Sequence, residues 1–278
     1  MDNAARKNRI KETFNIASAG YDKPALRFFA DAAEHLADSM GLTGSERILD
    51  VACGTGTVTL ACAQRLGNGH VLGVDLSECM VEKARVKAKA RNLDNLAFKC
   101  IDIETMDFGA NTFDGACCGF GIFFLPDMEA GLRIIKHHVK PNGVIAISSF
   151  TGAVMEPLSQ QFIDRIQSYG VELPPLSWKR LDDTAKLCSL YEAAGMDMET
   201  FEARTVQAGY HLTCFEEWWD ILWYSGFRGL LNQLSERELL RFQQEHREDI
   251  QKLATEQGIW LNVEVLIAVG CNFNLDSR

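Results

Sequence analysis

The chain has 278 residues, with 28 Lys and Arg against 38 Asp and Glu, so its formal net charge is −10 at pH 7. This acidic balance argues against electrostatic binding to nucleic acid or to an anionic membrane surface. Because 47% of the residues are hydrophobic, the chain can bury a sizeable core and fold unaided.

Cysteine usage and the N-terminal sequence indicate a reduced environment. The chain has nine cysteines but no C-x-x-C spacing, and no histidine lies at ligand spacing from two of them, which argues against a disulfide framework and a metal site. The first twelve residues, MDNAARKNRIKE, are too polar for a signal peptide, and no apolar run approaches the roughly 20 residues of a membrane span. We expect a cytoplasmic protein without a metal or stable membrane insertion.

The N-terminal segment, residues 3–42, predicts two helices that are interrupted around residues 18–20. Ile10, Phe14 and Ala17 fall on one helical face, and Tyr21 follows in the interruption. Packing of these helices on the core would explain the apolar faces.

The sequence RILDVACGTGTVTL, residues 47–60, is the central motif. An apolar run ends at Asp50, a turn with Gly54 and Gly56 follows, and helical chemistry resumes at Thr57. Glycine permits positive φ and a close approach of a ligand. The first free N–H groups of the next helix then face that ligand.

Two cofactor classes use such a turn. A dinucleotide site has G-x-G-x-x-G, but Thr59 stands at the third position, and Asp50 would repel a pyrophosphate. That acid suits the ammonium group of S-adenosylmethionine instead. The next apolar strand, HVLGVD, ends in Asp75, which is positioned to accept hydrogen bonds from both ribose hydroxyls.

Strands and helices alternate through the first half of the chain. Ser77 is a suitable N-cap for its helix, with Met80 on the inner face. The alternation predicts a parallel, doubly wound α/β sheet. The expected strands are residues 71–74, 96–100, 113–121 and 144–149, and the expected helices are residues 57–66, 77–92 and 126–138.

Beyond Phe150 the composition shifts, and all five tryptophans lie in this part. We expect a helix over residues 184–194, strands over 198–207 and 261–271, and two insertion helices, FEEWWDILWYSGFRGLLNQL and SERELLRFQQEHREDIQKLATEQ, between the strands. Ser235 and Glu238 form a capping box for the second insertion helix.

The insertion, residues 214–260, is too long to serve only the sheet, so it covers or binds something. Phe215, Trp219, Leu222 and Trp223 form an aromatic stripe on its first helix. Each of these side chains could belong to the core of a cap, and as a group they predict an enclosed apolar acceptor pocket.

The motifs LDVACGTGTVTL, VLGVDLSECMVEKAR, FDGACCGFGIFFLPD and HVKPNGVIAIS resemble those of class I S-adenosylmethionine-dependent methyltransferases. The likeness covers residues 14–150 and is greatest to the branch of the ubiquinone and menaquinone C-methyltransferases. It implies a Rossmann-like sheet of seven strands, six parallel and the last antiparallel, with helical cap insertions. We expect one domain with its core in residues 38–150, 182–212 and 260–273, and cap elements in residues 1–37, 151–181 and 213–259.

The resemblance also implies a set of cofactor-binding residues. Asp102 would accept from the adenine amino group, although it could instead be a helix-cap or loop acid. Leu76 and Met80 could sandwich the adenine or belong to the core, and Tyr21 would help to close the pocket. The full set is Tyr21, Asp50, Ala52, Cys53, Gly54, Thr55, Gly56, Asp75, Leu76, Met80, Asp102, Ile103, Gly119 and Phe120.

Methyl transfer from a sulfonium is an in-line displacement, for which the protein mainly supplies orientation and a dry site. The quinone enzymes carry an arginine–asparagine pair where this chain has Phe123-Phe124, so a polar group that ionises a phenol is not expected there. Tyr21 and His211 are other candidate bases, but a lone histidine is more often structural. No catalytic residue is assigned.

Three functions compete at this point. The first is transfer of a methyl group from S-adenosylmethionine to an uncharged or weakly charged, largely apolar small molecule, since few cationic residues lie between Cys214 and Gly226. The second is cofactor binding without turnover, and the third is a nicotinamide-dependent oxidoreductase. We expect a small-molecule substrate, no nucleic-acid partner, and a monomer or homodimer.

Overall fold

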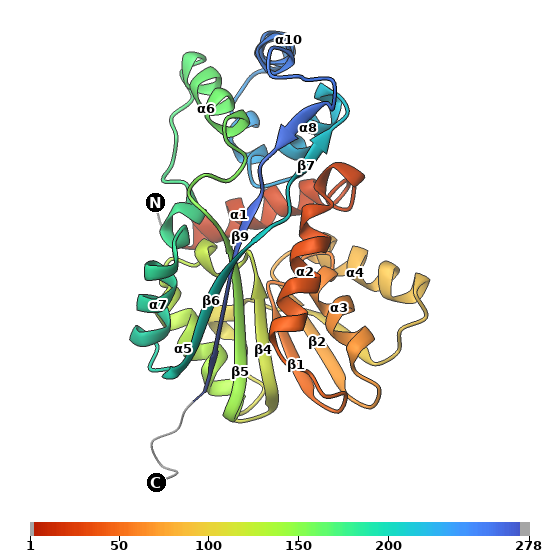
Figure 1. Cartoon of the computed structure of the whole chain (residues 1–278), viewed down its shortest axis with the longest axis vertical. Coiled ribbons are helices and arrows are strands. Elements are labelled where there is room, and N and C mark those ends of the chain that lie inside the picture. The colour runs from red at the N-terminus through yellow and green to blue at the C-terminus, as the bar shows by residue number, and fades with distance from the viewer. Residues whose placement is uncertain (1–2, 273–278) are drawn as a thin grey trace.

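A computed structural model describes residues 3–272, and a seven-stranded sheet forms its centre (Figure 1). The strand order is β3-β2-β1-β4-β5-β9-β6, with β9 antiparallel to both of its neighbours and the other six strands parallel. This confirms the predicted Rossmann-like sheet. The strands are β1 (Arg47–Val51), β2 (His70–Asp75), β3 (Leu96–Cys100), β4 (Phe113–Gly119), β5 (Val139–Phe150), β6 (Asp197–Gln207) and β9 (Glu264–Cys271).

Helices cover both faces of the sheet because successive strand residues point to opposite sides. Ile48 belongs to the apolar cluster with α2 (Phe28–Ser39) and α3 (Thr57–Arg65), whereas Leu49 belongs to the cluster with α5 (Met128–His138) and α7 (Thr184–Ala193). The helix α4 (Glu78–Ala90) packs against β2 and β3, and the Ser77 hydroxyl accepts the Met80 N–H as predicted.

Two boundaries differ from the expectation. We expected residues 1–37 in the cap, but α2 lies on the sheet, contacts α3, β4 and β5, and buries Leu36 and Ala37 completely. The core therefore begins with α2. The strand expected over residues 144–149 begins earlier, because β5 starts at Val139 and contains an irregular stretch in which Asn142 has a φ of 63°.

A helical cap stands over the carboxyl ends of the parallel strands (Figure 1). It consists of α6 (Leu158–Ser168), η4 (Ser177–Leu181), α8 (Phe215–Trp223), α9 (Arg228–Leu231), α10 (Glu236–Gln251) and a ribbon of β7 (Tyr210–Leu212) with β8 (Ile259–Leu261). The expected helix over residues 215–234 is broken between α8 and α9, at residues 224–227. The last sheet strand begins at Glu264 because Leu261 pairs with Tyr210 in the ribbon.

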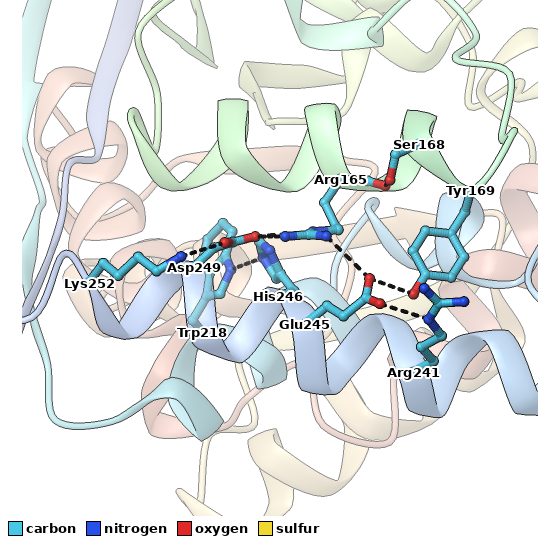
Figure 2. Close-up of polar contacts among 9 residues, drawn as sticks. All are labelled: Arg165, Ser168, Tyr169, Trp218, Arg241, Glu245, His246, Asp249 and Lys252. Atoms are coloured by element: carbon cyan, nitrogen blue, oxygen red, sulfur yellow. Dashed lines mark hydrogen bonds and ion pairs between the residues drawn. The ribbon is translucent and has the colours of Figure 1, made fainter.

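Polar contacts join α6 to α10 inside the cap (Figure 2). The Arg165 guanidinium binds Glu245 and Asp249 on α10, and the Tyr169 hydroxyl donates to Glu245 at 2.8 Å. The indole N–H of Trp218, on α8, donates to His246 Nε2 at 2.9 Å. Because three helices share these contacts, the cap is braced internally.

Within residues 3–272, no helix combines the length and apolar character needed to cross a membrane.

Two further elements precede the sheet in the chain. The helix α1 (Asn3–Ala17) crosses above the strand ends, and the short η1 (Pro24–Leu26) follows it (Figure 1). Together, α1 and α2 confirm the two predicted helices, and η1 lies in the interruption between them.

Candidate active site

The loop after β1 forms the floor of the site. Ala52, Gly54 and Gly56 all have positive φ, at 56°, 54° and 79°. A Cβ on Gly54 would meet nothing within 4 Å, so this position is open toward the cavity. A Cβ on Gly56 would lie 2.9 Å from the Phe98 ring and 3.0 Å from Ala84. The lack of a side chain at Gly56 therefore allows the loop to pack closely on β3 and α4, and the contact of Gly56 with a ligand stays a prediction.

The carboxylate of Asp75, at the end of β2, is fixed by backbone donors. One oxygen accepts the Gly54 N–H and the other accepts the Ser77 N–H, both at 2.8 Å. Burial raises the pKa of Asp75, while these N–H groups act in the opposite direction. Each oxygen keeps a further lone pair, so the side chain can accept two more hydrogen bonds.

A cavity of about 130 Å³ lies at the carboxyl ends of β1, β2 and β4. Ten of the fourteen predicted cofactor-binding residues line its wall: Tyr21, Ala52, Gly54, Asp75, Leu76, Met80, Asp102, Ile103, Gly119 and Phe120. The other wall residues were not predicted, and they are Lys7, Ile10, Phe14, Val74, Ile101, Gly121, Phe124, Leu125 and Pro126. The apolar face of Ile10 and Phe14 was a usable signal for α1, whereas nothing in the sequence singled out Lys7.

Asp50 is not in the cavity wall. Its side chain is completely buried beneath the loop, where one oxygen accepts the Thr59 hydroxyl and the other has no partner within residues 3–272. This burial raises the pKa of Asp50 to about 7. The structure therefore places Asp50 behind the loop, and its contact with a ligand ammonium group stays a prediction.

Cys53, Thr55 and Gly56 are the other predicted residues that do not line the cavity. The Cys53 side chain is buried in the apolar cluster formed with α3 and α4. The Thr55 hydroxyl donates to Asp22 at 2.8 Å, and Lys87 binds the same carboxylate. This contact attaches the segment after α1 to the loop after β1.

Asp102 both caps a turn and faces the cavity. One oxygen accepts the Glu104 N–H at the start of the short η2 (Ile103–Thr105), and the other pairs with Lys7 Nζ at 2.7 Å. Lys7 also pairs with Glu104, and Lys11 pairs with Glu78 on α4. The helix α1 therefore lies across the cavity and is held there by ion pairs.

A second cavity, of about 560 Å³, adjoins the first. Both cavities are lined by Ile10, Phe14, Tyr21, Phe120 and Phe124, so these five residues mark their junction. The remaining aromatic wall of the larger cavity is formed by Phe28, Phe29, Phe123, Phe150, Trp178 and Phe227.

The predicted aromatic stripe of α8 does not reach this wall. Phe215 and Leu222 are buried in the cap interior, and Trp219 stacks between Phe215 and Trp223. The insertion contributes Ser225, Gly226, Phe227, Gly229 and Leu230 instead. This result favours the core-packing interpretation of the stripe, because its side chains pack against the rest of the cap and away from the cavity.

The two candidate bases lie in different places. His211 belongs to β7, with its ring against Trp260, and lines neither cavity. Tyr21 lies at the junction of the cavities, stacked on Phe29 with ring centroids 4.8 Å apart. Burial, together with the charges of Asp75 and Asp22, raises the pKa of its phenol, so Tyr21 holds its proton at neutral pH.

Comparisons with known proteins identify the family of the chain. A family described as methyltransferase domain matches residues 48–143. The aklanonic acid methyltransferase DauC of Streptomyces sp. (strain C5) is 30% identical over 182 residues, which cover 64% of this chain and 83% of the relative. The ubiquinone/menaquinone biosynthesis C-methyltransferase UbiE of Idiomarina loihiensis is 28% identical and covers 74% of this chain and 84% of its own.

Two solved structures share the fold at low sequence identity. The YcgJ protein of Bacillus subtilis has a TM-score of 0.59 at 17% identity, covering 88% of this chain and 99% of its own. Phosphoethanolamine N-methyltransferase 2 of Haemonchus contortus, in complex with S-adenosyl-L-methionine, has a TM-score of 0.54 at 14% identity, covering 93% and 60%. The chain belongs to the class I S-adenosylmethionine-dependent methyltransferases and resembles the quinone C-methyltransferase group among them.

Proposed function

We propose that this methyltransferase binds S-adenosylmethionine in the smaller cavity and transfers its methyl group to a largely apolar small molecule in the larger one. The observation that carries the proposal is the shared wall of the two cavities. Five residues line both, and four of them are apolar or aromatic without a polar group. A methyl group can cross such a junction with water excluded, which favours in-line displacement.

The strand ends supply the cofactor contacts in this proposal. The Gly54 backbone lies against the cofactor, and Asp75 accepts from the ribose hydroxyls through the lone pairs that Gly54 and Ser77 leave free. Leu76 and Met80 pack on the adenine, Asp102 accepts from its amino group, and the backbone at Gly119 and Phe120 borders the methionine arm.

The proposed acceptor requires no base from the protein. No Asp, Glu or His of residues 3–272 lines the larger cavity, and Tyr21 holds its proton. The acceptor atom must therefore be nucleophilic on arrival, or must lose its proton before it enters the cavity. The chain's own contribution is to orient the two reactants and to keep the junction dry.

The names of the similar proteins support a bulky apolar acceptor. One relative is named for aklanonic acid and another for ubiquinone and menaquinone biosynthesis. The larger cavity, at about 560 Å³, falls within the roughly 300 to 1,000 Å³ that small-molecule pockets usually span.

A screen for production of S-adenosylhomocysteine tests the proposal. Aromatic and polycyclic compounds should be methylated, and Phe150→Ser should raise KM for them because Phe150 stacks on Phe120 at 4.3 Å in the cavity wall. Glu236→Gln, on the exposed end of α10, is a matched control that should leave KM unchanged. Methylation of phosphorylated or polycarboxylate compounds alone would contradict the apolar acceptor, and tight binding of NAD without the sulfonium cofactor would contradict the cofactor site.

A further inference from the structure

The charges around the larger cavity run against the charge of the whole protein. Its wall includes Arg6, Arg9 and Arg180 but no carboxylate from residues 3–272, although the chain carries a net charge of −10. None of these arginines forms an ion pair with another described residue, whereas Lys7, Lys11 and Lys87 around the smaller cavity and the cofactor loop all do. Three cations therefore line a largely apolar space whose wall contains no acidic side chain among residues 3–272.

Arg180 is held in a fixed position by the backbone. Its guanidinium donates to the carbonyl oxygens of Phe123, Leu125 and Pro126, the first at 3.1 Å and the last at 2.9 Å. These three bonds leave two of the five guanidinium N–H groups without a described partner. Burial and the nearby Arg6 lower the pKa of Arg180, and Asp127, the N-cap of α5, acts in the opposite direction. The two remaining N–H donors are therefore oriented before a ligand binds, and no carboxylate among the described residues competes for them.

The helix α1 divides its cations between two sides. Lys7 and Lys11 pair with acids around the smaller cavity, whereas Arg6 and Arg9 line the larger one. The two arginines of α1 therefore share the wall of the larger cavity with Arg180, which belongs to η4.

We propose that the acceptor molecule carries a carboxylate in addition to the atom that is methylated, and that Arg180 and Arg6 bind this carboxylate while its apolar body fills the aromatic cavity. The inference rests on the proposed function and names a substrate class for the same site. Arginine matches a carboxylate with paired hydrogen bonds, which are the strong ones. The sequence predicted an uncharged or weakly charged acceptor because few cations lie between Cys214 and Gly226. The arginines that line the cavity come from α1 and η4 instead.

The carboxylate is an anchor and not the methylated group. Arg6, Arg180 and Trp178 line only the larger cavity, whereas methyl transfer takes place at the junction. An oxygen that is paired with a guanidinium is also a poorer nucleophile, because the cation withdraws its electron density. Holding one end of the acceptor therefore presents the other end to the cofactor.

Binding of two matched probes tests this assignment in the full chain saturated with S-adenosylhomocysteine. The probes are anthracene carboxylate and the neutral anthracene carboxamide, which have the same ring system and differ in charge. Fluorescence anisotropy should show at least about tenfold tighter binding of the carboxylate, because a charge-assisted bond contributes about 1.5 to 3 kcal/mol.

Arg6→Met and Arg180→Met should each weaken carboxylate binding about tenfold and leave carboxamide binding within about twofold. Arg237→Met, on the exposed surface of α10, is the matched control and should change neither. Because Arg180 also donates to three backbone carbonyl groups, Arg180→Met could disturb the fold. Binding of S-adenosylhomocysteine checks that this variant is folded. If the variant is not folded, Arg6→Met decides the test.

Equal binding of the two probes to the unmodified protein would overturn the inference and leave the proposed apolar acceptor standing. Binding of neither probe, with S-adenosylhomocysteine still bound, would overturn both. A loss of carboxylate and carboxamide binding together in Arg6→Met would also contradict the assignment, because it would indicate a steric and not an electrostatic role.

Discussion

The two cavities of this protein are adjacent but are built in different ways. The cofactor cavity is formed largely by the residues that follow four neighbouring strands, β3, β2, β1 and β4, and the family match over residues 48–143 contains most of its wall. The acceptor cavity is assembled from α1, the segment around Phe28, the end of β5, η4 and the segment before α9, which lie far apart in the sequence.

The sheet therefore fixes the shape of the cofactor cavity, whereas the shape of the acceptor cavity depends on the cap. Strand ends are held by the ladders on both sides, so the backbone positions at the first cavity are rigid. The second cavity keeps its shape only while α1 and the cap remain docked. Substitutions at the cofactor cavity should therefore change cofactor affinity, whereas substitutions at α1 and the cap should change the stability and the opening of the cap.

The largest expected effect is on cofactor affinity in Asp75→Ala. This substitution removes the acceptor proposed for two ribose hydroxyls, and two bonds of about 1.5 kcal/mol each correspond to a loss of about a hundredfold. Calorimetry with S-adenosylhomocysteine measures it, and Asp94→Ala, an exposed acid before β3, is the control. Unchanged affinity in Asp75→Ala would remove the ribose assignment.

A second effect, of similar size, should appear as a pH dependence of the cap. Burial lowers the pKa of His246 to about 4 from its usual 6.5, so its contribution to stability is present above pH 6.5 and is lost as the pH falls toward 4 (Figure 2). The shift corresponds to about 3 kcal/mol. All five tryptophans lie after residue 150, so tryptophan fluorescence during urea unfolding reports on this half of the chain.

His246→Gln is the matched variant, because its amide oxygen can still accept the Trp218 N–H. It should be less stable than the unmodified protein at pH 7 and should lose the pH dependence between 6.5 and 4. The same acid transition in both proteins would show that another group is responsible.

A smaller effect is expected on stability in Asp50→Asn, and it distinguishes Asp50 from the proposed ribose acceptor Asp75. The pKa of Asp50 is raised to about 7 from 3.8, so the stability that it contributes at low pH is lost as the pH rises through this range. Asp50→Asn keeps an acceptor for Thr59 and should raise the free energy of unfolding at pH 8 by on the order of 2 kcal/mol. Its cofactor affinity should stay within about twofold; a large loss would place Asp50 in the binding site after all.

The smallest effect concerns the opening of α1. The cofactor cavity, at about 130 Å³, is smaller than most small-molecule pockets, so we expect α1 to move when ligands enter. The ion pair of Lys7 with Asp102 is partly exposed and should hold α1 by no more than about 1 kcal/mol. Lys7→Met should therefore speed hydrogen exchange in residues 3–22 by up to about fivefold without altering β4 or β5.

Ligands test whether residues 18–22 after α1 and residues 210–229 of the insertion together form a mobile cover over the two cavities of the unmodified protein. Amides of residues 18–22 and 210–229 should gain protection when S-adenosylhomocysteine and an acceptor bind. Equal protection with and without ligand, in a protein that sediments as a monomer, would contradict a mobile cover. Protection that rises with protein concentration would indicate a dimer interface instead.

The sequence by itself determined the sheet and most of the cofactor cavity. Apolar runs that end in Asp50 and Asp75, the glycine turn and the Ser77 cap are local patterns, and the predicted β3 has the observed bounds of residues 96–100. Strand ends in a parallel sheet meet at one edge, so knowing the strands was enough to place ten of the fourteen predicted residues in one wall.

Only the tertiary structure decided which neighbours those residues have. Gly56 and Asp50 satisfied the sequence pattern, yet one packs on Phe98 and the other lies beneath the loop, because the pattern does not say which side of a turn faces the ligand. The stripe on α8 and the arginines of α1 and η4 show the same limit for the acceptor cavity. Helical periodicity identifies an apolar face, but the element that covers that face, and the cations that approach from a distant segment, are set by the docking of the cap.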